Sequence, residues 1–419
     1  MTNKYDKMLD ETCLETVHPS GLLIRIVKKP GKSRKTAMIA TRFGSINREF
    51  EWNGAFRTVP NGTAHFLEHK LFEGKNGGAF DYYAKTGAKA NAYTSTDKTA
   101  YYFVCTDKFE QNLDILLSFV SNPYLTDENV AKEKGIIGQE IKMYEDDPTW
   151  QGYFGLIRCL YGTHPVKYDI AGSTDDIAPL DVETLMSCYN TFYQPSNMVL
   201  AVCGDIDENA VLAAVDKYFP PREPKTINQR VASEPRGVVR ERFEKIMPVS
   251  RPIFYIGFKD NDVAGDLARR EIETAMLLQI LFGASTPFYK ELYDSGVIDA
   301  EFDTEFELSD TYAFVLISGE SDEPDRVLAR VKDRISEFLE NGVSTEEFTR
   351  VRNTIYGELV SSLDNVSGVA SMLMTSGLSR REPFDAASVL SAVTPADIEA
   401  RGRALFADPD AAMSVIKGE

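Results

Sequence analysis

The residues best suited to chemistry in this chain are His65, Glu68 and His69, which stand in the run His65-Phe66-Leu67-Glu68-His69. The chain has only four histidines in 419 residues, so two of them in one short run is informative. On a helix, positions i and i+4 lie one above the other, and both imidazoles can therefore bind one metal ion. Glu68 lies at the edge of that face, where its carboxylate can hydrogen-bond a metal-bound water. This HxxEH pattern is the reverse of HExxH and supports the same metal chemistry.

A third metal ligand should follow downstream, because a catalytic zinc usually takes three protein groups and keeps one position for water. Glu133 and Glu140 are separated by about two helical turns, so they share one face of a helix. Ile136, Ile137 and Ile141 mark an adjacent stripe that we expect to face the core. One carboxylate would complete a site of two histidines and one glutamate. The other would orient a ligand histidine through its second ring nitrogen, and the residues alone leave open which is which.

These patterns resemble the pitrilysin, insulysin and mitochondrial processing peptidase family of zinc metallopeptidases, the inverzincins, in a short-chain bacterial form. The resemblance covers most of residues 15–220 and, more faintly, the remainder. The matching segments are His65-x-x-Glu68-His69, Leu71-Phe72-Glu73-Gly74, Asn91-Ala92-Tyr93-Thr94, the pair Glu133 and Glu140, and Tyr193-Gln194-Pro195-Ser196-Asn197-Met198.

The resemblance assigns roles within this set. In the family the second glutamate of the downstream pair is the metal ligand, which implies Glu140 here and leaves Glu133 to orient a ligand histidine. Asn91, Ala92 and Tyr93 fall in a segment similar to the family's edge strand, whose backbone pairs with an extended peptide. With Glu68 as general base on a zinc-bound water, the resemblance implies a zinc metalloendopeptidase of the HxxEH type, with Zn²⁺ as cofactor and peptides as substrates.

Composition bounds the class of protein. A chain of 419 residues and 46.8 kDa predicts two domains rather than one. No apolar run approaches the roughly 20 residues that span a bilayer, and Met1 to Met8 form no export signal. The five cysteines are scattered without a CxxC pair, which is typical of reduced thiols, so we expect a cytoplasmic protein with no membrane association. The net charge of −18 argues against nucleic acid as a partner.

The order of elements predicts an α+β fold. Val59-Pro60-Asn61-Gly62 is typical of a turn, with Thr63 as N-cap of the motif helix. Strands are expected at 22–27, 37–43, 90–95, 100–105 and 199–203, with helices at 80–85, 108–121, 127–146 and 180–192. After the proline-rich stretch 221–240, strands are expected at 253–258, 297–307 and 311–318, with helices at 266–282, 323–340, 345–363 and 394–406.

We therefore expect two α+β domains, each a mostly antiparallel sheet with helices packed on one face. The resemblance implies that the two domains are similarly folded. The N-terminal domain, 1–220, would be the zinc-binding catalytic domain, and 221–240 would be the linker. The C-terminal domain, 241–419, would have a similar fold without a metal site.

The C-terminal half departs from the family pattern. Peptidase members often carry an Arg and, several residues on, a Tyr that grip the substrate from the domain opposite the zinc. Here Tyr293 (or Leu292, depending on the register) and Asp299 stand at those positions, and none can act as a cationic clamp. The resemblance then implies a two-subunit chamber made of two half-rings. We expect a heterodimer with a related chain that lacks the zinc motif but carries the gripping pair, with a homodimer as the alternative.

Two alternatives to a general peptidase stay open. The first is a non-catalytic scaffold or peptide-binding subunit of a paired peptidase complex, although such relatives typically lose motif residues that are all present here. The second is a maturation protease dedicated to one peptide product. His18 and His164 each precede a proline in a context common at the surface, and we do not expect them to bind metal.

Overall fold

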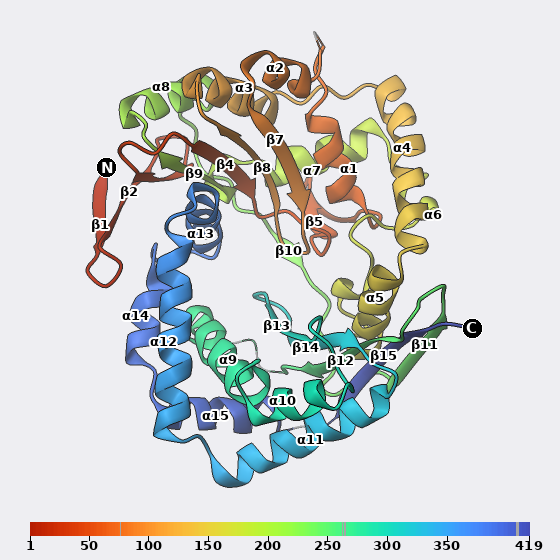
Figure 1. Ribbon diagram of the computed structural model, residues 1–419. Coiled ribbons are helices and arrows are strands. Elements are labelled where there is room, and N and C mark those ends of the chain that lie inside the picture. Colours follow the sequence, from red (N-terminus) through yellow and green to blue (C-terminus); the bar gives the residue numbers. More distant parts are fainter. Residues whose placement is uncertain (76, 262, 264, 408–409) are drawn as a thin grey trace. The chain divides into compact units, whose positions relative to one another are not determined.

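The computed structural model describes residues 1–75, 77–261, 263, 265–407 and 410–419 (Figure 1). Packing divides the chain into two compact units. Unit 1 comprises Met1–Ile141, Asp169–Val231 and Leu359–Asp385, and unit 2 comprises Lys142–Tyr168, Ala232–Glu358 and Ala386–Glu419. The predicted linker 221–240 contains one of the points at which the chain passes between them, and each unit also takes in one segment from the other half of the sequence. The division into an N-terminal domain, 1–220, and a C-terminal domain, 241–419, stays a prediction.

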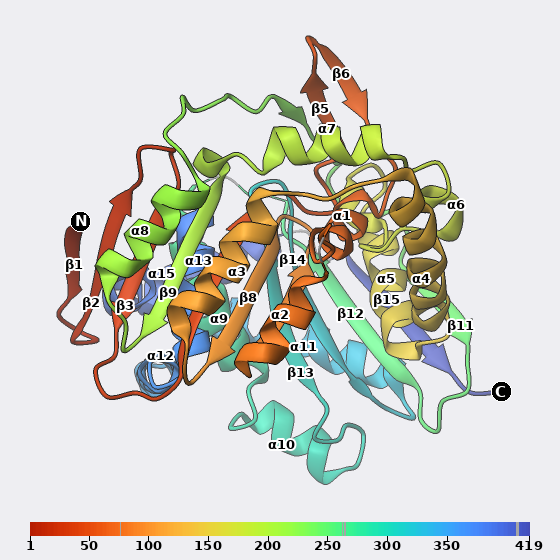
Figure 2. The ribbon, with the colours of Figure 1, turned by 90° about the horizontal axis from the view of Figure 1, so that it is seen from above.

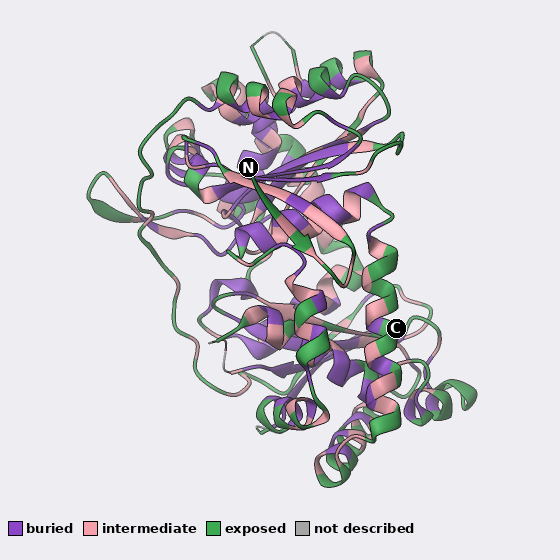
Figure 3. Cartoon of the chain, turned by 90° about the vertical axis from the view of Figure 1, so that its left-hand side faces the viewer, coloured by how far each residue is buried: buried purple, intermediate pink, exposed green. Residues whose placement is uncertain are grey.

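Unit 1 is built on a seven-stranded sheet with the order β1-β2-β3-β9-β4-β8-β7, in which only the β3–β9 pair is parallel. The strands are β1 (Thr2–Asp6), β2 (Glu11–Val17), β3 (Leu23–Lys28), β4 (Lys35–Thr41), β7 (Lys89–Thr94), β8 (Thr99–Cys105) and β9 (Met198–Gly204). A small sheet of β5 (Glu49–Trp52), β6 (Ala55–Thr58) and β10 (Gln229–Arg230) stands beside it. Strand β9 is buried along its whole length, as its unbroken apolar run requires. Figure 3 shows buried segments, in purple, along central strands and exposed segments, in green, on outer helices.

Helices cover both faces of this sheet. Figure 2 shows α2 (Ala79–Thr86), α3 (Phe109–Ser121) and α8 (Glu208–Tyr218) across one face. Met38 and Ala40 belong to a core cluster with α13 (Val366–Leu378), whereas Ala37 and Ile39 alternate with them and are buried as well. Arg25 of β3 holds α13 by donating to the Ser376 hydroxyl at 2.8 Å. The helices α2, α3 and α8 agree with the expected layer on one face, and α13, which comes from far along the chain, adds a helix to the other face.

Unit 2 repeats the topology of unit 1. Its sheet has the order β11-β15-β12-β14-β13, with β11 parallel to β15 and every other pair antiparallel. The strands are β11 (Arg242–Ile246), β12 (Ile253–Lys259), β13 (Asp303–Leu308), β14 (Ala313–Glu320) and β15 (Ala411–Lys417). This matches β3-β9-β4-β8-β7 strand for strand and direction for direction. The expectation of two similarly folded α+β domains is confirmed.

Unit 2 receives α5 (Pro148–Leu160), which packs on β11, β12 and β15. Gly152 permits the close approach, because a Cβ there would lie 2.5 Å from the Tyr255 ring. The remaining helices are α1 (Thr63–Leu71), α4 (Asp127–Glu145), α6 (Thr174–Ile177), α7 (Val182–Phe192), α9 (Leu267–Phe282), α10 (Pro287–Asp294), α11 (Pro324–Asn341), α12 (Thr345–Ser362), α14 (Asp385–Ala392) and α15 (Pro395–Leu405), with short 3-10 turns at Pro165–Lys167 and Pro195–Asn197. Across the described residues, no helix is both long and apolar enough to cross a bilayer.

Candidate metal centre

Helix α1 carries the motif and is held deep in unit 1. All of its residues except His69 are buried. Thr63 is not the N-cap, contrary to expectation: Gly62 occupies that position with φ 79°, and the Thr63 hydroxyl donates to the Pro60 carbonyl at 2.7 Å. Glycine is required there because a Cβ would lie 2.2 Å from the Ala171 carbonyl oxygen. A tight, glycine-dependent turn therefore fixes the start of the helix that bears the histidines.

Helix α4 supplies the two glutamates. Glu133 is buried and Glu140 is partly exposed on the same face of the helix. Ile137 and Ile141 are buried as expected, but Ile136 is 48% exposed and does not belong to the core-facing stripe. At about 100° per residue around the helix, Ile136 lies on one side of Glu133, and Ile137 and Ile141 lie on the other. The buried face of the helix therefore includes Ile137 and Ile141 but not Ile136.

His65, His69 and Glu140 converge on one point. Each offers one ligand atom, and these atoms all lie within 4.8 Å of one another. Nε2 of His65 is 3.7 Å from Oε1 of Glu140, and Nε2 of His69 is 3.5 Å from Oε2 of the same carboxylate. These separations exceed a normal hydrogen bond. They suit a shared zinc ion, whose bonds of about 2.0–2.2 Å would put tetrahedral ligand atoms roughly 3.4 Å apart.

The donor set also fits zinc chemically. Two imidazoles and one carboxylate are the ligands of several catalytic zinc sites that keep a fourth position open. The 3.7 Å distance shows that Nε2 is the nitrogen that His65 directs toward Glu140, and within the described chain its buried Nδ1 has no hydrogen-bond partner. The residues present therefore fit a zinc ion.

We call the three converging residues His65, His69 and Glu140 the cluster. Glu133 is not part of it and lies behind His69. Its Oε1 is 3.1 Å from Nδ1 of His69, so the carboxylate accepts that N–H and leaves Nε2 facing Glu140. Its Oε2 accepts from the Lys70 ammonium at 3.3 Å, and Lys70 also pairs with Glu73 at 2.7 Å. Lys70 is fully buried, which is rare for a lysine and requires such partners. The sequence analysis did not single it out, because a lysine between His69 and Leu71 gives no signal of a buried charge.

The pKa values of the two histidines are shifted in opposite directions. Burial, followed by repulsion from His69, lowers the pKa of His65 to about 4. Burial alone would lower the pKa of His69, but the hydrogen bond to Glu133 and the nearby carboxylates outweigh it and raise that pKa. Burial likewise acts to raise the pKa of Glu133, but the bond to His69 and the charge of Lys70 outweigh it and lower that pKa. Glu133 is therefore an ionised partner for His69.

Glu68 sits beside the cluster and is 7% exposed. Burial raises the pKa of its carboxyl, and hydrogen bonds from Thr94 counter part of that rise. The Thr94 hydroxyl donates to Oε2 of Glu68 at 2.7 Å. A carboxyl whose pKa is raised is better suited to hold a proton during a reaction.

The predicted substrate strand, β7, is one of the two edge strands of the sheet. Strand β7 pairs with β8 alone, through Asn91↔Tyr102, Ala92↔Tyr101 and Tyr93↔Ala100. The Asn91 side chain accepts from the Ala92 backbone N–H at 2.9 Å. The backbone groups of an edge strand that face away from its neighbour can pair with an added strand, and here the Asn91 side chain takes the place of such a partner at the Ala92 N–H.

The other residues singled out in the sequence are not among the converging ligand candidates of the described chain. Tyr293 is 49% exposed on α10, and Asp299 pairs with Arg251 at 3.1 Å, both within unit 2. The expectation that His18 and His164 lie at the surface is wrong, because both are buried and hydrogen-bonded. Each accepts a backbone N–H two residues on, which is what the following proline turn makes available.

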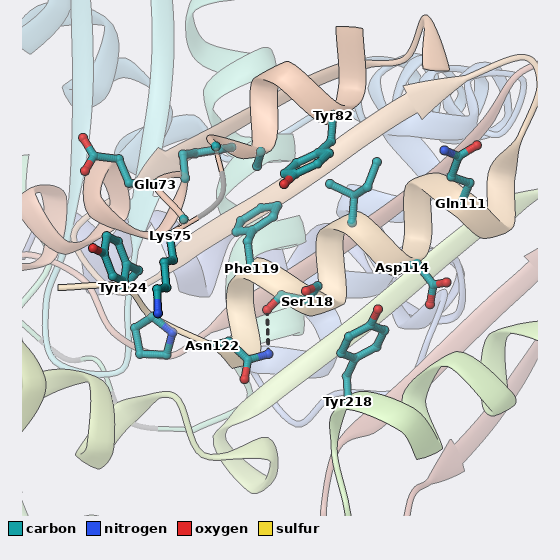
Figure 4. A pocket seen from close by; sticks show the side chains of 16 residues that line it. Glu73, Lys75, Tyr82, Gln111, Asp114, Ser118, Phe119, Asn122, Tyr124 and Tyr218 are labelled. Carbon is teal, nitrogen blue, oxygen red and sulfur yellow. Dashed lines mark hydrogen bonds between the residues drawn. The ribbon is translucent and has the colours of Figure 1, made fainter. Parts of the chain in front are cut away.

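A cavity of about 590 Å³ opens in unit 1 beside α2 and α3 (Figure 4). Aromatic side chains make up much of its wall, among them Phe72, Tyr82, Phe119 and Tyr124. Its described lining includes Glu73, the partner of Lys70, but none of the converging metal-ligand candidates. The cavity is thus a neighbour of the candidate metal centre and not the centre itself.

Comparison with known proteins gives consistent matches. Residues 57–159 match the family model "Insulinase (Peptidase family M16)", and residues 179–355 match "Peptidase M16 inactive domain". An uncharacterised zinc protease of Bacillus subtilis is 36% identical, covering 94% of this chain and 94% of its own. The beta subunit of the mitochondrial-processing peptidase of Caenorhabditis elegans is 33% identical over 38% of this chain and 36% of its own.

A solved structure is also similar over nearly the whole chain. The crystal structure described as an M16-like peptidase from Alicyclobacillus acidocaldarius has a TM-score of 0.94 and 34% identity, covering 98% of this chain and 99% of its own. The HxxEH run and both glutamates of α4 fall within the range of the first family model.

Proposed function

This chain belongs to peptidase family M16, and we propose that it is a zinc-dependent endopeptidase in which Glu68 acts as the general base. The observation that carries the proposal is the convergence of His65, His69 and Glu140, from two helices, on one point beside Glu68. Relatives named zinc proteases support the choice of metal.

His65, His69 and Glu140 would hold the zinc ion, which when bound supplies a Lewis acid and lowers the pKa of water. Glu68 takes the proton of the attacking water and later passes it to the leaving amine, a role that its buried position suits. Glu133 keeps His69 oriented, with Nδ1 as donor and Nε2 toward the cluster. Lys70 keeps Glu133 ionised by placing a buried positive charge beside it.

The substrate would be a peptide in extended form. Asn91, Ala92 and Tyr93 lie on the free edge of β7, where an added strand gains main-chain hydrogen bonds that depend little on its sequence. The substrate class is therefore unstructured peptide rather than one folded protein.

The proposal includes a partner. Neither Tyr293 nor Asp299 offers a cation to a peptide carbonyl, and Asp299 already pairs with Arg251. A relative of this chain is named as one subunit of a processing peptidase. We therefore favour a heterodimer, with a related zinc-free chain that completes a substrate chamber, over a homodimer. The five cysteines are all free and buried, which supports a reducing, cytoplasmic setting.

One observation favours the non-catalytic alternative: residues 179–355 match a model described as an inactive domain. That match, however, begins after the cluster, and the chain keeps every residue of the motif. A scaffold or peptide-binding subunit has no need for a buried Lys70–Glu133–His69 chain behind a metal ligand. We therefore rank the enzymatic function first.

Chelation tests the proposal. The full chain, purified without chelator, should cleave an unstructured quenched-fluorescence peptide, lose that activity on dialysis against 1,10-phenanthroline and regain it with one equivalent of Zn²⁺. Cleavage that survives complete removal of metal, checked by elemental analysis, would reject the zinc mechanism.

A further inference from the structure

Thr94 ends strand β7 and contacts Glu68, although nothing in the proposed mechanism has yet used it. Its hydroxyl donates to Oε2 of Glu68 at 2.7 Å. We propose that Thr94 is a positioning residue that fixes the Glu68 carboxylate through its hydroxyl and ties that alignment to the strand on which the peptide pairs. The inference rests on the proposed function, since it assigns Glu68 the role of base.

The direction of the Thr94 hydrogen bond follows from counting protons. Thr99 lies opposite Thr94 in the β7–β8 ladder, and the two hydroxyl oxygens are 3.3 Å apart. The single hydroxyl proton of Thr99 is already donated to the Phe43 carbonyl at 2.7 Å. Thr99 can therefore only accept from Thr94, and an ionised carboxylate at 2.7 Å is a better acceptor than a hydroxyl at 3.3 Å. The Thr94 proton is thus directed at Glu68.

Burial makes this alignment rigid. Thr99 is fully buried and Glu68 is 7% exposed, so neither exchanges its partner freely for bulk water. A glutamate side chain has several rotamers, and an unanchored carboxylate beside the cluster would sample more than one. Because a displacement of about 1 Å at a reacting group can cost on the order of 100-fold in rate, one hydrogen bond that selects the rotamer matters to catalysis.

The same residue links substrate binding to the base. Thr94 lies one residue beyond the segment Asn91–Tyr93, whose edge would receive the peptide. A peptide that pairs with β7 would therefore bind to the strand whose last residue already holds the carboxylate that must accept a proton. Thr94 thus places the substrate edge and the base on one element.

Three variants test the inference in whichever assembly the wild-type chain is active. Thr94→Val keeps the shape but removes the hydroxyl, and Thr94→Ser restores it. Thr36→Val is the matched control, because Thr36 is a buried threonine of the same sheet whose hydroxyl donates only to the Phe103 carbonyl. For Thr94→Val we expect kcat to fall about 10- to 100-fold, with KM within about twofold and zinc content unchanged. Thr94→Ser and Thr36→Val should stay within about threefold of wild type.

Two kinetic results would overturn the inference: an unchanged kcat in Thr94→Val, or an equal loss in Thr94→Ser. A loss confined to KM would also overturn it, because it would make Thr94 a binding residue only. Crystal structures give a second readout that needs no turnover. Glu68 should keep one rotamer in wild type and Thr94→Ser and adopt more than one in Thr94→Val, and a single shared rotamer in all three refutes the positioning role. A wild-type chain without hydrolysis would reject the proposed function, and the rotamer comparison would still decide this inference.

Discussion

The imidazole of His69 lies between two carboxylates, with Nδ1 3.1 Å from Glu133 and Nε2 3.5 Å from Glu140. The shorter contact is a hydrogen bond and the longer one is not, so the two glutamates have different roles although they share a helix face. Glu133 orients the His69 ring, and Glu140 faces the same point as Nε2 of that ring. Replacing each glutamate in turn separates these roles.

Glu133→Gln should weaken zinc binding by about 10- to 100-fold, the range typical of residues behind a metal ligand. The amide can still accept from His69 but carries no charge to make the ring a stronger donor of its lone pair. Competition with a chromophoric chelator measures the affinity. Glu128→Gln, an exposed change in the first turn of the same helix, is the control. Equal affinities in both variants would show that Glu133 is not coupled to the site.

Glu140→Gln should lose zinc more severely than Glu133→Gln, because it removes a ligand rather than a ligand's support. We expect metal content well below one zinc per chain after gel filtration, measured by elemental analysis, with an unchanged far-ultraviolet spectrum. The reverse ranking would exchange the two roles and make Glu133 the ligand.

His164 predicts a pH dependence of stability that is independent of the metal centre. Burial lowers its pKa from 6.5 to about 4. The folded state therefore binds fewer protons than the unfolded state between these pH values, and stability falls as the pH drops from about 6.5 toward 4. From this group alone we expect a loss of about 2 kcal/mol between pH 7 and pH 5.

His164→Asn should remove that loss while keeping an acceptor for the Val166 backbone N–H. Urea unfolding of both proteins at pH 7 and pH 5 measures the difference. Parallel changes in the two proteins would mean that His164 does not carry this pH dependence.

The partner proposal predicts a division between metal binding and turnover. The isolated chain should bind one zinc yet cleave peptides slowly, and a related zinc-free chain should raise kcat without changing metal content, since positioning alone can contribute on the order of 100-fold. Native mass spectrometry of complexes from the source cell identifies the partner. A purified homodimer that turns over at roughly 1 per second or faster would contradict the two-chain arrangement.

Much of this architecture could be predicted from the sequence because the signals are local. The runs that became β9, α3 and α11 are long and strongly patterned, and their predicted limits agree with the structure to within about two residues, as boundary fraying allows. The convergence of His65, His69 and Glu140 follows from spacing on two helices together with the family resemblance. Their role as zinc ligands stays a proposal.

What could not be predicted depends on contacts distant in sequence. Helix α13 packs on the sheet of unit 1, whose strands end some 150 or more residues earlier, and α5 packs on the sheet of unit 2. Local periodicity therefore predicts neither position. Lys70 and Thr94 acquire their roles only when α1 meets α4 and β7. In the sequence alone, a lysine and a threonine at the end of a strand look like ordinary surface residues.

The most direct test of the central claim is peptide hydrolysis by wild type and Glu68→Gln at equal zinc content, followed by mass spectrometry of the products. The account predicts internal cleavage by wild type and a rate at least about 100-fold lower for Glu68→Gln, since a general base contributes 10²- to 10⁴-fold. Both proteins should retain one zinc per chain, because Glu68 is not among the converging ligands. Equal cleavage by the two proteins at matched zinc content would contradict the account.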